Sequence, residues 1–217
     1  MKNMETILGI AALIIAVMIH EISHGLAALW CGDSTAKEAK RLSLNPVRHI
    51  DPIGTIVLPV IFAITRSPVM FGWAKPVPVN LARTRNPRQA FWIVSIAGPM
   101  SNLLQSLLGV GIFHALVRIP LYQTSPYILI MAVNVLASFS LQYSAVNIVL
   151  MTFNLIPIPP LDGSKVLASV LPYHLAMQYL QIERFGFIII YLLLQQGVFS
   201  GLINGVLKGF FALTGIT

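Results

Sequence analysis

Long apolar stretches run along most of the sequence, and short polar segments separate them. Residues 6–30 form the first stretch, which polar side chains interrupt only between positions 20 and 24. Residues 91–117 and 127–153 form two more, and each of the three exceeds the roughly 20 residues that a membrane-spanning helix needs. Residues 185–213 suit either one tilted helix or a broken pair, because glycines interrupt them. The pattern predicts an all-α polytopic membrane protein with about four to six transmembrane helices.

A shorter apolar stretch, residues 53–65, follows the first and is too short to span a membrane comfortably. Pro59 interrupts it, and Asp51 and Pro52 precede it. Basic residues flank it on both sides: Lys37, Lys40, Arg41 and Arg48 before it, and Arg66, Lys75, Arg83, Arg85 and Arg88 after it. The positive-inside rule favours both groups on the cytoplasmic side. We therefore expect a re-entrant or surface segment here, with a full crossing left open.

The same distribution of charge predicts the orientation of the chain. The loop of residues 118–126 holds one basic residue, so we expect it on the outer side together with the N-terminus. The first helix then runs inward and ends on the side where residues 154–163 also lie. This predicts a multi-pass protein of the cell membrane whose candidate chemistry lies toward the cytoplasmic side.

Composition agrees with a membrane protein and argues against other classes. Of the 217 residues, 56% are hydrophobic and 10% are charged, whereas a soluble domain carries roughly 25% charged residues. Mean hydropathy is +0.80. The chain is too short for a separate soluble domain once several spans are allotted, so residues 1–217 are expected to form a single integral-membrane domain. The net charge of +7 lies in loops between apolar runs, which argues against a nucleic-acid partner.

A secretory signal peptide is an alternative interpretation of the first stretch, since Lys2 precedes an apolar region of suitable length. Cleavage near Ala27 would remove the polar positions at 20–24. Ionisable residues at membrane depth are costly and usually functional, so we favour a retained helix.

Those polar positions form the motif His20-Glu21-Ile22-Ser23-His24. Two histidines four residues apart lie on nearly the same face of a helix, so both imidazoles can bind one zinc ion. The glutamate between them lies beside the metal, where it can take a proton from a water molecule that zinc activates. We predict His20 and His24 as zinc ligands and Glu21 as the catalytic base.

A third ligand is expected, because catalytic zinc commonly has three protein ligands and one open position. Residues 154–163 contain three closely spaced prolines, which forbid a continuous helix, and Asp162 follows them. Of the seven carboxylates, Asp162 is the one in an apolar, broken-helix setting at the depth predicted for the two histidines. Asp162 is therefore the candidate third ligand of one zinc ion per chain.

At these positions the chain resembles the site-2 protease family of intramembrane zinc metalloproteases. Its motifs are HEISH, Ala97-Gly98-Pro99 with Asn102, and the N-x-x-P-x-P-x-L-D-G pattern of residues 154–163. Residues 41–46, 49–55 and 72–80 add a likeness to the compact bacterial and archaeal subgroup. The resemblance covers most of the chain, and it implies His20, His24 and Asp162 as zinc ligands, Glu21 as general base, and Asn154 as a substrate-binding residue.

The resemblance also implies a function, the hydrolysis of peptide bonds in or near the transmembrane segments of membrane proteins. Its partners would be those substrates and the lipid bilayer. One alternative is a membrane transporter or channel that uses the same residues as a metal-transit site. A second is a non-catalytic relative that engages substrate without cleaving it. The identity of the substrate and the oligomeric state stay open.

Rows of small and polar residues follow the second and third long stretches: Gly98, Asn102, Gln105 and Gly109, then Ser140, Ser144, Asn147 and Asn154. Such rows either line a path to zinc or let helices pack closely, and we favour packing for all but Asn154. The proline-rich residues 76–79 are expected to be extended, and we hypothesise that they, with the segment around Gly54, offer an edge to an unwound substrate.

Overall fold

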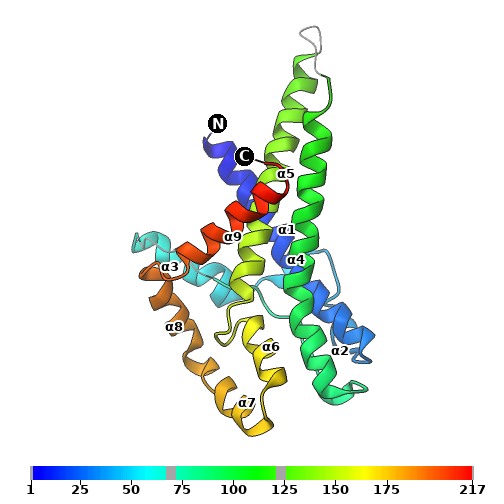
Figure 1. Cartoon of the computed structure of the whole chain (residues 1–217), viewed down its shortest axis with the longest axis vertical. Helices are drawn as coiled ribbons and strands as arrows, with labels where there is room; N and C mark the ends of the chain where they lie inside the picture. Colours follow the sequence, from blue (N-terminus) through cyan, green and yellow to red (C-terminus); the bar gives the residue numbers. More distant parts are fainter. Residues whose placement is uncertain (1, 67–71, 121–125, 217) are drawn as a thin grey trace.

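The computed structural model describes residues 2–66, 72–120 and 126–216, and the secondary structure in these ranges is helical. Its helices are α1 (Lys2–Trp30), α2 (Thr35–Glu38), α3 (Leu58–Ile64), α4 (Pro87–Val117), α5 (Tyr127–Asn154), α6 (Asp162–Val170), α7 (Tyr173–Leu180), α8 (Glu183–Gln195) and α9 (Ser200–Leu213). Short 3-10 or π helices are η1 (Pro46–His49), η2 (Pro52–Val57) and η3 (Leu81–Arg83). In Figure 1 the long helices α1, α4 and α5 form a bundle, with the shorter helices beside and below it.

Three helices are long and apolar enough to cross a membrane: Asn3–Trp30 of α1, α4 and α5, with mean hydropathies of 2.1, 1.4 and 1.6. A fourth candidate exists if α7 and α8, which meet at a 60° bend, are taken as one span. Among the described residues there are thus three or four candidate spans, with shorter apolar helices next to them. This confirms a polytopic all-α membrane protein, at the lower end of the predicted number of spans.

The short apolar stretch after α1 does not form a spanning helix. It consists of the π-helical turn η2 followed by α3, and its apolar part covers Pro52–Phe62. The Asp51 carboxylate starts it by accepting hydrogen bonds from the backbone N–H groups of Ile53 (3.0 Å) and Gly54 (2.7 Å). In Figure 1 this segment lies across the direction of the long helices. The arrangement agrees with the predicted re-entrant or surface segment.

Small and polar residues let α4 and α5 approach closely. The Ser106 hydroxyl donates a hydrogen bond to the Ser144 carbonyl (2.9 Å), and the Ser144 hydroxyl donates one to the Ser106 carbonyl. A Cβ atom on Gly109 would lie 2.7 Å from Ser144 Oγ and 2.9 Å from Ser140 O, so only glycine fits at this crossing. The outer part of the two polar rows therefore serves helix packing, as predicted.

The chain leaves α5 through a non-helical segment, residues 155–161, as its prolines require. A buried apolar cluster ties this segment to α8 and to the residue before α9: Ile156, Leu161, Ile190 and Phe199. Gly197 has a left-handed backbone conformation (φ +69°) and separates α8 from α9. The last apolar stretch is therefore the broken pair, and α6 begins at Asp162, directly after the anchored segment.

Candidate metal centre

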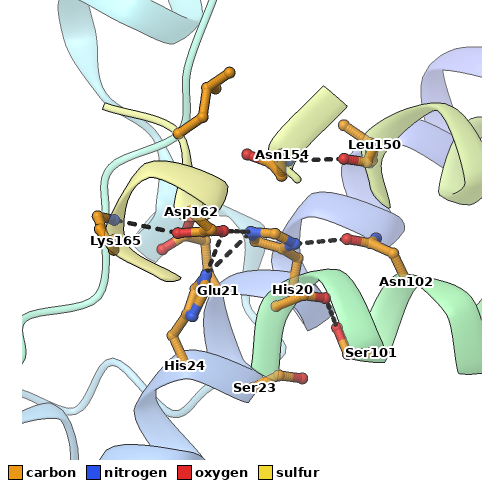
Figure 2. Close-up of polar contacts among 12 residues, drawn as sticks. His20, Glu21, Ser23, His24, Ser101, Asn102, Leu150, Asn154, Asp162 and Lys165 are labelled. Carbon is orange, nitrogen blue, oxygen red and sulfur yellow. Dashed lines mark hydrogen bonds and ion pairs between the residues drawn. The ribbon is translucent and has the colours of Figure 1, made fainter. Parts of the chain in front are cut away.

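His20, His24 and Asp162 converge on one point inside the bundle. The first two lie one turn apart on α1, and Asp162 is the first residue of α6. The Asp162 Oδ2 atom lies 3.2 Å from His20 Nε2 and 3.1 Å from His24 Nε2, and the two Nε2 atoms are 3.1 Å apart. All three residues are buried, with 6%, 9% and 4% of their surfaces exposed. Figure 2 shows the three side chains pointing toward one another.

This donor set suits a zinc ion. Imidazole nitrogen and carboxylate oxygen are common zinc ligands, with bonds of about 2.0–2.2 Å, and a tetrahedral ion holds such atoms ~3.3 Å apart. The observed separations of 3.1–3.2 Å are close to that value. Three ligand atoms from three buried residues also leave the fourth tetrahedral position for a reactant. In its geometry the cluster therefore fits a catalytic zinc site.

Hydrogen bonds on the far side of each imidazole fix which nitrogen faces the cluster. His24 Nδ1 donates to the Val94 carbonyl (2.7 Å), and His20 Nδ1 lies 2.5 Å from Asn102 Oδ1. Because a carbonyl oxygen can only accept, each Nδ1 carries the proton and each Nε2 presents its lone pair. Both rings are thereby held in the tautomer that binds metal through Nε2.

Asn102 is itself oriented by a second amide. Its Nδ2 donates to Asn147 Oδ1 (2.7 Å), and Asn147 Nδ2 donates to the Tyr143 carbonyl (2.9 Å). The Tyr143 carbonyl can only accept, so it fixes which end of each asparagine amide donates and which accepts. This turns Asn102 Oδ1 toward His20. Helix packing alone therefore does not describe the inner part of the polar rows. The prediction that the rows serve packing misses the role of Asn102 and Asn147 in orienting His20. The motif of Ala97-Gly98-Pro99 with Asn102 was the sequence pattern that could have indicated this role.

Gly98 lets α4 lie against the two imidazoles. A Cβ atom at this position would fall 2.6 Å from His20 Cε1 and closer still to His24 Nε2. No side chain could be accommodated there without displacing a ligand. Glycine is thus required at position 98 because a larger residue would collide with the two histidines of the cluster.

The two carboxylate oxygens of Asp162 have different partners. Its Oδ2 atom faces the histidines, while Oδ1 accepts a hydrogen bond from Lys165 Nζ (3.1 Å), one turn later on α6. Lys165 was not predicted, because its contact depends on α6 starting at Asp162. The following Gly163 packs against the backbone of the broken segment, where a Cβ atom would lie 2.7 Å from Ile156 O. The turn into α6 is thereby fixed close to the cluster.

Glu21 and Asn154 have different surroundings. The half-buried Glu21 lies between the two histidines on α1, and its Oε2 atom accepts a hydrogen bond from the backbone N–H of Val77 (2.9 Å). Asn154 is the last residue of α5, and its Nδ2 atom donates to the Leu150 carbonyl (3.0 Å). Figure 2 draws this contact with Leu150, and within the described part of the chain no hydrogen bond joins Asn154 to a member of the cluster.

Comparisons with known proteins give one consistent family. The model of Peptidase family M50 matches residues 8–194. A relative from Bacillus subtilis, named "Putative zinc metalloprotease YwhC", is 38% identical over 187 residues, which cover 83% of this chain and 76% of the relative. "Putative zinc metalloprotease Rip2" from Mycolicibacterium smegmatis is 26% identical over 211 residues, covering 97% of this chain and 75% of that protein. No solved structure matches the chain.

Proposed function

The chain belongs to Peptidase family M50, and from this membership we propose that it is an intramembrane zinc endopeptidase that cleaves membrane proteins in or near their transmembrane segments. It is a multi-pass membrane protein and a zinc metalloprotease by family. The observation that carries the finer proposal is the place of the buried cluster, whose two histidines lie within the long apolar helix α1. A protease with its metal ligands at that depth is suited to substrates that share the membrane.

The proposed ligands are His20, His24 and Asp162, with one zinc ion per chain. When bound, zinc supplies a Lewis acid that polarises the scissile carbonyl and makes a water molecule more acidic. Val94 and Asn102 hold the two rings with Nε2 toward the cluster. The Asp162 carboxylate adds negative charge on one side through Oδ2, while the Lys165 ammonium group holds Oδ1.

Glu21 is proposed as the general base. In an H-E-x-x-H helix the glutamate between the two histidines is suited to lie beside the bound metal, which supports this role for the Glu21 carboxylate. There it accepts a proton from the attacking water and returns it to the leaving amine. Asn154 is proposed to help hold substrate, since it ends α5 immediately before the broken segment that leads to Asp162.

We further propose that the cluster lies toward the cytoplasmic side. The basic groups that flank residues 53–65 support this orientation, because positively charged loops are retained on that side. A peptide bond in a regular helix hides its carbonyl in an intrahelical hydrogen bond. Cleavage therefore requires a locally unwound substrate, which is more easily reached near the membrane surface than at its centre.

Replacing Glu21 with glutamine tests the function. The Glu21→Gln protein, purified with zinc and reconstituted in lipid vesicles, is expected to keep its zinc content and to lose cleavage of a membrane-embedded peptide by a factor of at least about 100. A metal-transit site needs no base, so a transporter would keep zinc passage across the vesicle membrane in this variant. Retained peptide cleavage would sink the proposed mechanism.

A further inference from the structure

The strap, which we define as residues 73–80, crosses α1 and reaches Glu21. Its Val77 N–H donates a hydrogen bond of 2.9 Å to Glu21 Oε2, between residues 56 positions apart in the chain. We propose that the strap is a positioning device for the base, in which the Val77 N–H holds the Glu21 carboxylate in its reactive orientation. This inference rests on the proposed function, because it assigns to Val77 a task in the same reaction.

The sequence of the strap isolates this one donor. Pro76 and Pro78 carry no N–H group, so Val77 is the single backbone donor within three consecutive residues. A proline also restricts the residue before it to an extended backbone, which keeps Val77 from turning away. An amide N–H, unlike a hydroxyl, cannot accept a hydrogen bond, so at this position it can only donate to Oε2, and it leaves Oε1 for the reacting proton.

Buried groups fasten the strap on both sides of Val77. Arg41 Nη2 donates to the Lys75 carbonyl (2.7 Å), and the Lys75 N–H donates to the His49 carbonyl (2.9 Å). On the other side, the Asn80 N–H donates to Asp33 Oδ2 (2.6 Å). Arg41 and Asp33 are almost fully buried, and their hydrogen bonds to the strap offset part of the cost of burying their charges.

The surroundings of Asp33 favour the ionised form of its carboxyl group. Burial acts to raise the pKa of its carboxyl group, but hydrogen bonds from Thr35 and Asn80 outweigh burial and lower the pKa below the ordinary value. The carboxylate that anchors the end of the strap is therefore ionised at neutral pH. A charged acceptor makes the stronger hydrogen bond to the Asn80 N–H.

Close packing at Gly25 sets the distance between the strap and α1. Gly25 follows Glu21 by one turn and lies on the same helical face. A Cβ atom on Gly25 would fall 2.9 Å from Val77 Cγ1 and 3.1 Å from Ala36 Cβ. Glycine therefore permits the approach that brings the Val77 N–H within hydrogen-bonding distance of the carboxylate.

The rival interpretation is the edge hypothesis, in which the strap pairs with substrate. The two interpretations differ in kinetics, because one N–H cannot serve Glu21 and a substrate carbonyl at the same time. Loss of an orienting bond to the base lowers kcat, whereas loss of a substrate contact raises KM. The Val77→Pro variant removes the N–H at a position that the following Pro78 restricts to an extended backbone.

We expect Val77→Pro to lower kcat by ~10- to 100-fold, with unchanged zinc content and a KM within about threefold of wild type. Val77→Ala keeps the N–H and is expected to lose less activity than Val77→Pro. Equal kcat in the two variants would overturn the proposal, as would a raised KM at unchanged kcat. If Glu21→Gln abolishes cleavage while Val77→Pro keeps the wild-type kcat, the strap proposal fails and the proposed function stands.

A second pair of variants leaves the sequence of the strap intact. Arg41→Met removes the bond to Lys75 O and is expected to lower kcat by about tenfold with zinc retained. The matched control is Arg48→Met, because Arg48 is exposed and donates to Lys40 O, outside the strap. Equal activity in these two variants would contradict the proposal.

Hydrogen exchange provides a readout that does not depend on activity. In Glu21→Ala the Val77 amide loses its acceptor, so we expect it to exchange at least about tenfold faster than in the wild type. Glu38→Ala is the control, since Glu38 pairs with Arg83 on the surface. An unchanged rate at Val77 in Glu21→Ala would show that the bond does not hold the two segments together.

Discussion

At the scale of single residues, the side chains behind the ligands explain how the cluster is held ready for metal. His20 lies against Asn102, which is turned by Asn147, and His24 lies against a backbone carbonyl of α4. Neither ring can rotate without breaking a buried hydrogen bond. The helix α4 therefore supplies the orientation of two ligands that α1 carries.

Replacing Asn102 with alanine tests this arrangement. We expect Asn102→Ala to weaken zinc binding by ~10- to 100-fold, because His20 loses the acceptor that fixes its tautomer and ring direction. Zinc affinity is measured by competition with a chelator of known strength. Ser101→Ala is the control, since the Ser101 hydroxyl donates to the Gly98 carbonyl and no hydrogen bond joins it to His20 in the described part of the chain. Equal affinities in the two variants would show that Asn102 serves packing alone.

The sequence revealed the ligands more readily than their supports. His20 and His24 are four apart on one helix, so their proximity follows from helical geometry alone. Asn102 faces His20 only because of the register between α1 and α4, and Lys165 meets Asp162 only because α6 starts at that aspartate. The motif that contains Asn102 and the three-residue spacing of Asp162 and Lys165 do not by themselves reveal these two contacts, so both required the three-dimensional structure.

At the scale of helices, predictions succeeded where length or proline decided the outcome. The spans α1, α4 and α5 follow from apolar stretches that are longer than a bilayer needs. The non-helical residues 155–161 follow from their prolines. The last apolar stretch stayed ambiguous, because a glycine weakens a helix without forbidding it, and Gly197 breaks it through its positive φ.

The crossing of α4 and α5 can be tested with two glycines of the same helix. A side chain at Gly109 would collide with Ser144 and Ser140, whereas around Gly111 the space is open. We expect Gly109→Val to lower the free energy of unfolding by about 1–3 kcal/mol more than Gly111→Val. Thermal unfolding of both zinc-bound variants in detergent measures the difference. Because the two substitutions share the same cost in helix propensity, equal midpoints would contradict a tight crossing at Gly109.

At the scale of the whole molecule, the site is assembled from segments that are far apart in sequence. His24 and Asp162 are separated by 138 positions in the sequence. They meet because α1 carries His24, and the segment that follows α5 carries Asp162, to the same level of the bundle. Charge asymmetry between loops predicted that common depth before any contact was known. The same asymmetry predicts the side of the membrane on which the site opens, and this is the part of the topology that calls for an experiment.

The single cysteine makes that experiment direct. Cys31 follows α1 at the end that carries the cluster, and its carbonyl accepts a hydrogen bond from the Arg85 N–H just before α4. We expect a membrane-impermeant thiol reagent to label Cys31 in inside-out vesicles and not in intact cells. Burial raises the pKa of this thiol, so labelling is run at alkaline pH, where more thiolate is present.

The opposite end of α4 supplies the matched control. Arg118 is exposed and caps the other terminus of that helix, so a Cys31→Ser chain that carries Arg118→Cys is expected to show the reverse pattern. Because α4 is one continuous helix of 31 residues, its two ends must lie on opposite sides if it crosses the membrane. Labelling of Cys31 from outside intact cells would place the cluster at the outer face. It would also mean that the basic loops beside residues 53–65 are translocated, against the rule from which the orientation was inferred.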